Sequence, residues 1–164
     1  MPLARTLLPT LALLLSGCWG DPHYESCNML EKKPLPEDIV GTWNSSKDSF
    51  KTSWCPPSLK NQLQTHPMQL TFSKDGTFLY RNYSTEKSYS PDTWSKLEDI
   101  RGTWAIYTSI PGSGSTSYGV NLNFRKNGTN ETVSASFYGK RPNCLIFTHG
   151  DPDSGEAYFL DKTK

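Results

Sequence analysis

The stretch SYGVNLNF, residues 117–124, decides the fold class of this chain, because its apolar and polar residues alternate one by one. Residues 131–137 and 68–72 repeat the alternation. A period of two over such lengths predicts antiparallel strands with one face toward the core and one toward water. In the first stretch the apolar face consists of Tyr118, Val120, Leu122 and Phe124.

Two glycine-containing turns join strands of this kind. Asp75-Gly76 and Asn127-Gly128 are pairs that accept the positive φ angles of a tight hairpin. A third turn, at residues 151–155, precedes the last apolar segment. The pattern predicts about eight strands, at residues 39–43, 68–73, 77–83, 101–107, 118–124, 131–138, 144–148 and 156–160. Helical signal is thin and is strongest at residues 56–63.

Regularly spaced hairpins with alternating faces favour a small barrel or a sandwich. Of these we predict the barrel, because closure removes exposed sheet edges. The expected fold is all-β: a small antiparallel up-and-down barrel of about eight strands. The interior of such a barrel is either filled by side chains or holds one small ligand.

A short motif occurs twice among these strands. IVGTW, residues 39–43, recurs as IRGTW, residues 100–104, and LTFSKDGTF, residues 70–78, lies between the copies. Over residues 38–162 this order resembles the bacterial lipocalin-like domain proteins, many of which are small lipoproteins. The resemblance implies a lipocalin-like barrel. Physically, the glycine permits close backbone approach and the tryptophan is a large plug for a barrel end.

The beginning of the chain has the order of a secretory signal. Arg5 is followed by an apolar run at residues 6–15 and by small residues. A run of about ten residues is too short to span a membrane, which needs roughly 20. LSGC, residues 15–18, resembles the bacterial lipobox, which implies cleavage before Cys18 and acylation of that residue. The alternative is an ordinary secretory signal cut near Gly20.

These features divide the chain into a lipoprotein signal peptide at residues 1–17, a flexible tether at 18–37 and the barrel domain at 38–164. The lipobox implies a lipid anchor in a membrane of the bacterial cell envelope, in either leaflet, with the domain in the periplasm or outside the cell. Four sequons for N-glycosylation would instead suit a secreted eukaryotic protein, but four is only a mild excess over chance in a chain rich in Asn, Ser and Thr, and we prefer the interpretation as polar turn residues. They begin at Asn44, Asn82, Asn127 and Asn130.

Charge and motifs argue against several function classes. Loss of Arg5 with the signal leaves 16 basic and 16 acidic residues, so we expect no nucleic-acid partner. His23, His66 and His149 stand alone, without the spacing of metal ligands. The acidic turn at 151–156 lacks the spacing of a calcium loop. With no nucleotide loop or nucleophile motif either, we expect no metal, no cofactor and no enzyme activity.

Two functions remain open. In the first, the barrel binds a small hydrophobic ligand; in the second, it grips an envelope protein through the long segments 44–67 and 84–99. Aromatic residues that line the ligand pocket, or simply fill the core, are Trp43, Trp104, Phe78, Tyr80, Phe124 and Phe137. Residues expected to contact a partner are Trp54, Tyr89 and Trp94.

Three cysteines remain after lipidation of Cys18. An oxidising envelope allows one disulfide among Cys27, Cys55 and Cys144. We favour Cys55 with Cys144 because both lie inside the predicted domain. The competing interpretation of Cys144 is a buried thiol beside apolar neighbours.

Overall fold

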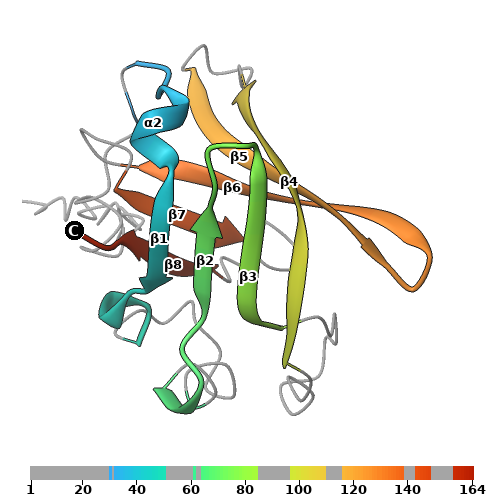
Figure 1. Cartoon of the computed structure of the whole chain (residues 1–164). Helices are drawn as coiled ribbons and strands as arrows, with labels where there is room; N and C mark the ends of the chain where they lie inside the picture. Colours follow the sequence, from blue (N-terminus) through green and yellow to red (C-terminus); the bar gives the residue numbers. More distant parts are fainter. Residues whose placement is uncertain are drawn as a thin grey trace, which may run out of the picture.

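The chain folds, in a computed structural model, into a closed barrel of eight antiparallel strands (Figure 1). Each strand pairs with the next in sequence, and β8 returns to pair with β1. The prediction of a small all-β up-and-down barrel is therefore confirmed. The structure describes residues 30, 32–50, 61, 64–84, 97–109, 116–138, 143–148 and 157–164. The strands are β1 (Gly41–Ser45), β2 (Gln69–Phe72), β3 (Thr77–Ser84), β4 (Leu97–Ser109), β5 (Ser117–Lys126), β6 (Thr129–Tyr138), β7 (Cys144–Thr148) and β8 (Ala157–Lys162).

A short helix, α2 (Pro36–Ile39), leads into the barrel, so the strand predicted at 39–43 is wrong at its beginning. Pro36 is at the start of the helix, where its missing N–H costs no hydrogen bond. Gly41, which begins β1, has a φ of 131°, a conformation that side chains disfavour. The helix therefore ends in a backbone turn that needs glycine. After β1 the chain forms a 3-10 helix, η1 (Lys47–Phe50).

Strand β4 begins four residues earlier than the sequence pattern indicates, at Leu97 instead of residue 101. Glu98 and Asp99 conceal this extension, because acidic residues are depleted in strands. The register between β3 and β4 shifts between Tyr80 and Tyr83, where Asn82 has a φ of 55°. The backbone N–H of Asn82 donates to Asp99 Oδ1 at 3.2 Å. An acidic side chain thus supports the bulge from the neighbouring strand.

Both predicted hairpin turns are present. Gly76 has a φ of 83°, and Asn127 and Gly128 have φ angles of 49° and 83°. In the first turn the backbone N–H and the hydroxyl of Thr77 donate to Asp75 Oδ1 at 3.0 and 2.7 Å. Both hydrogen bonds lower the pKa of the Asp75 carboxyl, and the bond from the Thr77 hydroxyl has the larger effect. The positive φ angles expected at both residues of a turn are present at Asn127-Gly128, whereas in the first turn only Gly76 has one, and Asp75 instead accepts these hydrogen bonds.

The two Gly-x-Trp copies converge on Phe72. The ring centre of Trp43 lies 6.1 Å from that of Phe72, in an edge-to-face arrangement. The ring centre of Trp104 lies 5.3 Å from that of Phe72, also edge to face. The indole N–H of Trp43 donates to Ile39 O at 3.0 Å, and that of Trp104 to Ser73 O at 3.2 Å. In Figure 1, α2 and the β2–β3 turn lie at the same end of the barrel. Both tryptophans therefore pack at this end.

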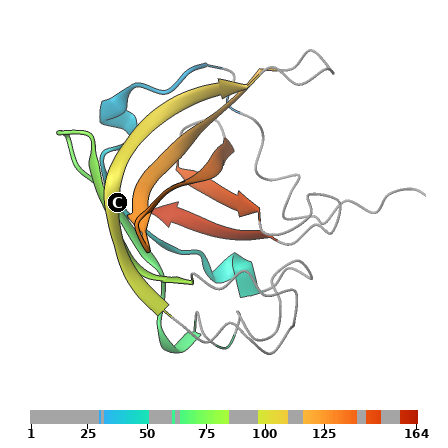
Figure 2. The same ribbon diagram turned by 90° about the vertical axis from the view of Figure 1, so that its right-hand side faces the viewer.

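Strand β4 curves strongly as it wraps the barrel (Figure 2). At Gly102 a Cβ atom would lie 2.0 Å from the carbonyl oxygen of Asn123 in β5. No side chain fits at that separation, so the two backbones approach here only because residue 102 is glycine. The glycines of the two motif copies thus have different roles. Gly41 adopts a positive φ angle, whereas Gly102 allows the backbones of β4 and β5 to approach closely.

Candidate functional site

Aromatic side chains from opposite walls meet in the described part of the barrel interior. Tyr80 in β3 lies 5.7 Å from Phe147 in β7, ring centre to ring centre, although these strands are on opposite sides of the ring. Trp43 in β1 similarly lies 6.1 Å from Phe137 in β6. Ring separations of this size are those of packed aromatic pairs. The described interior is filled by the chain's own side chains at these levels.

A buried polar group lies among these rings. The hydroxyl of Tyr80 donates to that of Tyr158 at 3.1 Å and lies 3.4 Å from the sulfur of Met68. Burial raises the pKa of Tyr80 well above its usual value, while the bond to Tyr158 acts in the opposite direction. Burial, with a smaller effect of Glu131, raises the pKa of Tyr83 to about 12. Both Tyr80 and Tyr83 are held as neutral phenols.

The aromatic residues considered for ligand contact all lie in or against this core. Trp104 is half-buried and packs against it, and the remaining five are 7% exposed or less. Those five are Trp43, Phe78, Tyr80, Phe124 and Phe137. Their mutual packing favours the core-filling interpretation over a ligand pocket.

Several predicted site residues lie outside the described residues. The lipidation site Cys18 and the partner-contact residues Trp54, Tyr89 and Trp94 are among them. So are Cys27 and Cys55, and the disulfide pairing stays a prediction. Cys144 is buried in β7, 8% exposed. Leu30, ahead of the predicted domain start, is also buried in the core.

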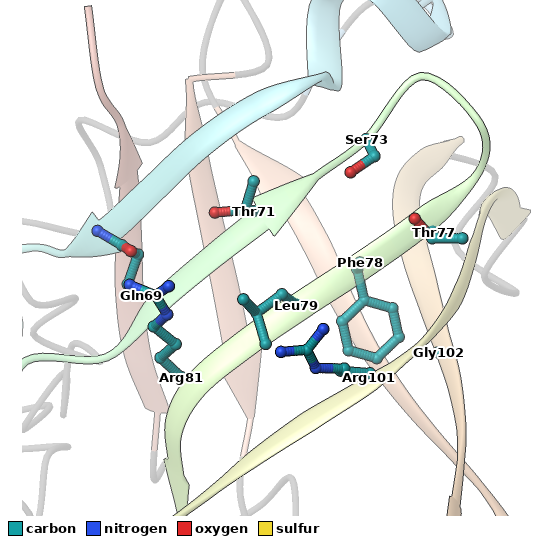
Figure 3. A pocket seen from close by; sticks show the side chains of 9 residues that line it. All are labelled: Gln69, Thr71, Ser73, Thr77, Phe78, Leu79, Arg81, Arg101 and Gly102. Carbon is teal, nitrogen blue, oxygen red and sulfur yellow. The ribbon is translucent and has the colours of Figure 1, made fainter.

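A hollow of about 570 Å³ lies on the outer face of β2, β3 and β4 (Figure 3). The residues of the hollow come from three strands and gather only when those strands pair, so the sequence alone does not reveal it. The one signal in the sequence is a pair of arginines at polar positions of neighbouring strands. The hollow is lined by Gln69, Thr71, Ser73, Thr77, Phe78, Leu79, Arg81, Arg101 and Gly102.

Strand register sets the order of side chains in the hollow. Leu79 is directly opposite Arg101 on β4 and Thr71 on β2, and Arg81 is opposite Gln69. Arg81 and Arg101 are therefore diagonal neighbours across Leu79, and Figure 3 shows a guanidinium group on either side of Leu79. Both arginines are exposed. The hollow is a shallow polar site with two positive charges and an apolar centre.

Other kinds of site were sought among the described residues. There, no group of three or more His, Cys, Asp or Glu side chains is arranged to hold a metal ion. Nor does any helix within the described ranges have the length and apolar character needed to cross a membrane.

Comparison with protein families, with curated proteins and with solved structures finds no match to this chain in any of the three.

Proposed function

We propose that this chain is a lipid-anchored protein of the bacterial cell envelope that is not an enzyme and binds a partner protein through the outer surface of its barrel. The observation that carries this proposal is the contact of aromatic rings across the lumen, Tyr80 with Phe147 and Trp43 with Phe137. An interior occupied by its own side chains is a scaffold and not a container. Binding is therefore expected at the outer surface of the barrel. The anchor rests on the lipobox ending at Cys18.

Carriage of a small hydrophobic ligand in the barrel is the competing function. A ligand at the level of Tyr80 would have to displace packed rings and separate the Tyr80 and Tyr158 hydroxyl groups. Leaving a buried hydroxyl without a partner costs about 1–3 kcal/mol, and lost packing adds to that. The partner-binding function needs no such rearrangement, so we prefer it.

The β2–β4 side is the best candidate for the binding surface. It carries the hollow, and both long segments of the chain attach to its strands. The predicted segment 44–67 begins in β1 and ends just before β2. The predicted segment 84–99 covers the connection from β3 to β4, although residues 97–99 already belong to β4. Long loops on a rigid scaffold are common sites of protein contact.

A photo-crosslinking residue in place of Leu79 is expected to capture one defined envelope protein in living cells. Leu79 lines the hollow, so a partner seated there lies within reach. The matched control replaces Ser134, an exposed residue on β6 whose hydroxyl donates a hydrogen bond to Asn121 Oδ1. We expect an adduct at residue 79 and none at residue 134. No adduct at 79, or equal adducts at both positions, would contradict the proposed surface.

Lipidation is tested separately by feeding cells labelled palmitate. The wild-type protein is expected to take up label and sediment with membranes, because several acyl chains anchor a protein firmly. Cys18→Ser should lose the label and become soluble, whereas Cys27→Ser, outside the lipobox, should keep it. An unlabelled wild-type protein would refute the anchor while leaving the binding surface to be judged by crosslinking.

A further inference from the structure

We infer that the hollow on β2–β4 binds an extended acidic segment of a protein, with two carboxylates that pair with Arg81 and Arg101. This inference names the partner chemistry of the surface proposed above, and its biological meaning rests on that proposal. Arginine presents a planar set of N–H donors that matches a carboxylate in bidentate fashion.

Neither arginine side chain is engaged by the described part of the chain. Within the part of the chain that the structure describes, no hydrogen bond or ion pair involves the guanidinium of Arg81 or Arg101. The exposed acid next along β4 is Asp99, two residues before Arg101, and its Oδ1 accepts a hydrogen bond from the backbone N–H of Asn82. Two like charges thus lie side by side on one face, and among the described residues the carboxylate of Asp99 offsets only part of their charge. An external anion would relieve their repulsion.

The rest of the lining suits a polypeptide more than a small ion. None of the nine lining residues is acidic, and Ser73 and Thr71 add hydroxyl groups along one side. Leu79 places an apolar, half-buried surface between the two arginines. A volume of about 570 Å³ is much larger than a single oxyanion requires.

Spacing favours an extended segment with acids at alternate positions. Diagonal neighbours on regularly paired strands lie about 7–8 Å apart. Arg81 and Arg101 are diagonal across Leu79, at the point where the β3–β4 register begins to shift. In an extended peptide, residues i and i+2 point the same way and are separated by about 6.7 Å. Two Asp or Glu residues separated by one other residue would therefore face the two guanidinium groups, with the peptide backbone between them lying over Leu79.

The test uses the full mature protein in non-ionic detergent and measures the fluorescence anisotropy of a labelled peptide with alternating glutamate and alanine. The comparison peptide has glutamine in place of each glutamate. We expect the glutamate peptide to bind and the glutamine peptide not to bind. Binding should weaken as salt is added. The double variant Arg81→Gln/Arg101→Gln should weaken binding roughly tenfold or more, and Arg81→Lys/Arg101→Lys by less, because lysine keeps the charge and loses the bidentate geometry.

The matched control is Lys164→Gln, which removes an exposed positive charge after the end of β8, outside the residues that line the hollow. It should bind the glutamate peptide as the wild type does. Equal binding by the double variant would overturn the inference. So would arginine-dependent binding of inorganic phosphate, or of phosphatidylglycerol vesicles, by a protein that ignores the peptide.

The peptide experiment and the crosslinking experiment fail independently. Peptide binding that depends on Arg81 and Arg101, without any adduct at residue 79 in cells, would refute the proposed function and leave the site standing. An adduct at residue 79 from a protein that ignores the glutamate peptide would refute the acidic segment and leave the binding surface standing.

Discussion

Gly102→Ala is expected to lower the free energy of unfolding by about 3 kcal/mol, the upper part of the range for overpacking a tight site. Its Cβ would lie 2.0 Å from a backbone oxygen of Asn123 and 3.0 Å from the ring of Phe78. The backbone oxygen has no rotamer to escape into. Strands β4 and β5 must separate locally, which weakens their hydrogen bonds. Urea unfolding followed by circular dichroism measures the loss.

Gly128→Ala is the matched control for this substitution. Gly128 has a φ of 83° with nothing within 4 Å of the position of its Cβ, so alanine there meets backbone strain alone, about 1 kcal/mol. The prediction is that Gly102→Ala costs clearly more. If the two variants unfold at the same urea concentration, close approach of β4 and β5 is not what residue 102 provides.

The second large effect is alkaline: the barrel is expected to lose stability steeply above pH 10. The phenols of Tyr80 and Tyr83 have pKa values raised above 10.0, that of Tyr83 to about 12. Below pH 10 both groups are protonated in the folded and the unfolded chain, and stability is unaffected. Above pH 10 the unfolded chain releases these protons at a lower pH than the folded chain does, so deprotonation stabilises the unfolded state relative to the folded state. Each tyrosine contributes up to about 1.4 kcal/mol per pH unit, and the pair up to about 2.7.

Tyr83→Phe isolates this effect. The variant removes one of the two phenols, so the slope of stability against pH between 10 and about 12 should fall by up to about 1.4 kcal/mol per pH unit. Other groups that titrate in this range are common to both proteins and cancel in the difference. Unfolding by urea at a series of pH values gives the two slopes. Equal slopes would mean that Tyr83 ionises normally in the folded barrel.

The strands and turns of this barrel could be predicted largely from local pattern. Alternation in residues 117–124 states which side chains face inward, and Asp75-Gly76 and Asn127-Gly128 state where the chain reverses. Exceptions occur where local propensity misleads. Glu98 and Asp99 conceal the first part of β4, and Ile39, an apolar β-branched residue, ends a helix. In both places tertiary contacts override the propensity of the residue type.

The candidate hollow could not be predicted in this way. Gln69, Leu79 and Arg101 belong to three strands, and an outward-facing position in one strand has no known neighbour until the register is set. The filling of the lumen could not be predicted either, because it depends on which strands face each other in the closed barrel. Alternation predicts that Tyr80 and Phe147 point inward, but only the closed ring places them 5.7 Å apart.

By itself, then, the sequence determined the fold class, the two tight hairpins and which face of the clearly alternating strands points inward, since each depends on neighbours along the chain. Tertiary structure alone decided the pairing of β1 with β8, the different needs of Gly41 and Gly102, and the position of Arg81 beside Arg101. The physical reason is that a period of two specifies the face of a strand, whereas the partner and the register are set by packing and closure of the whole barrel.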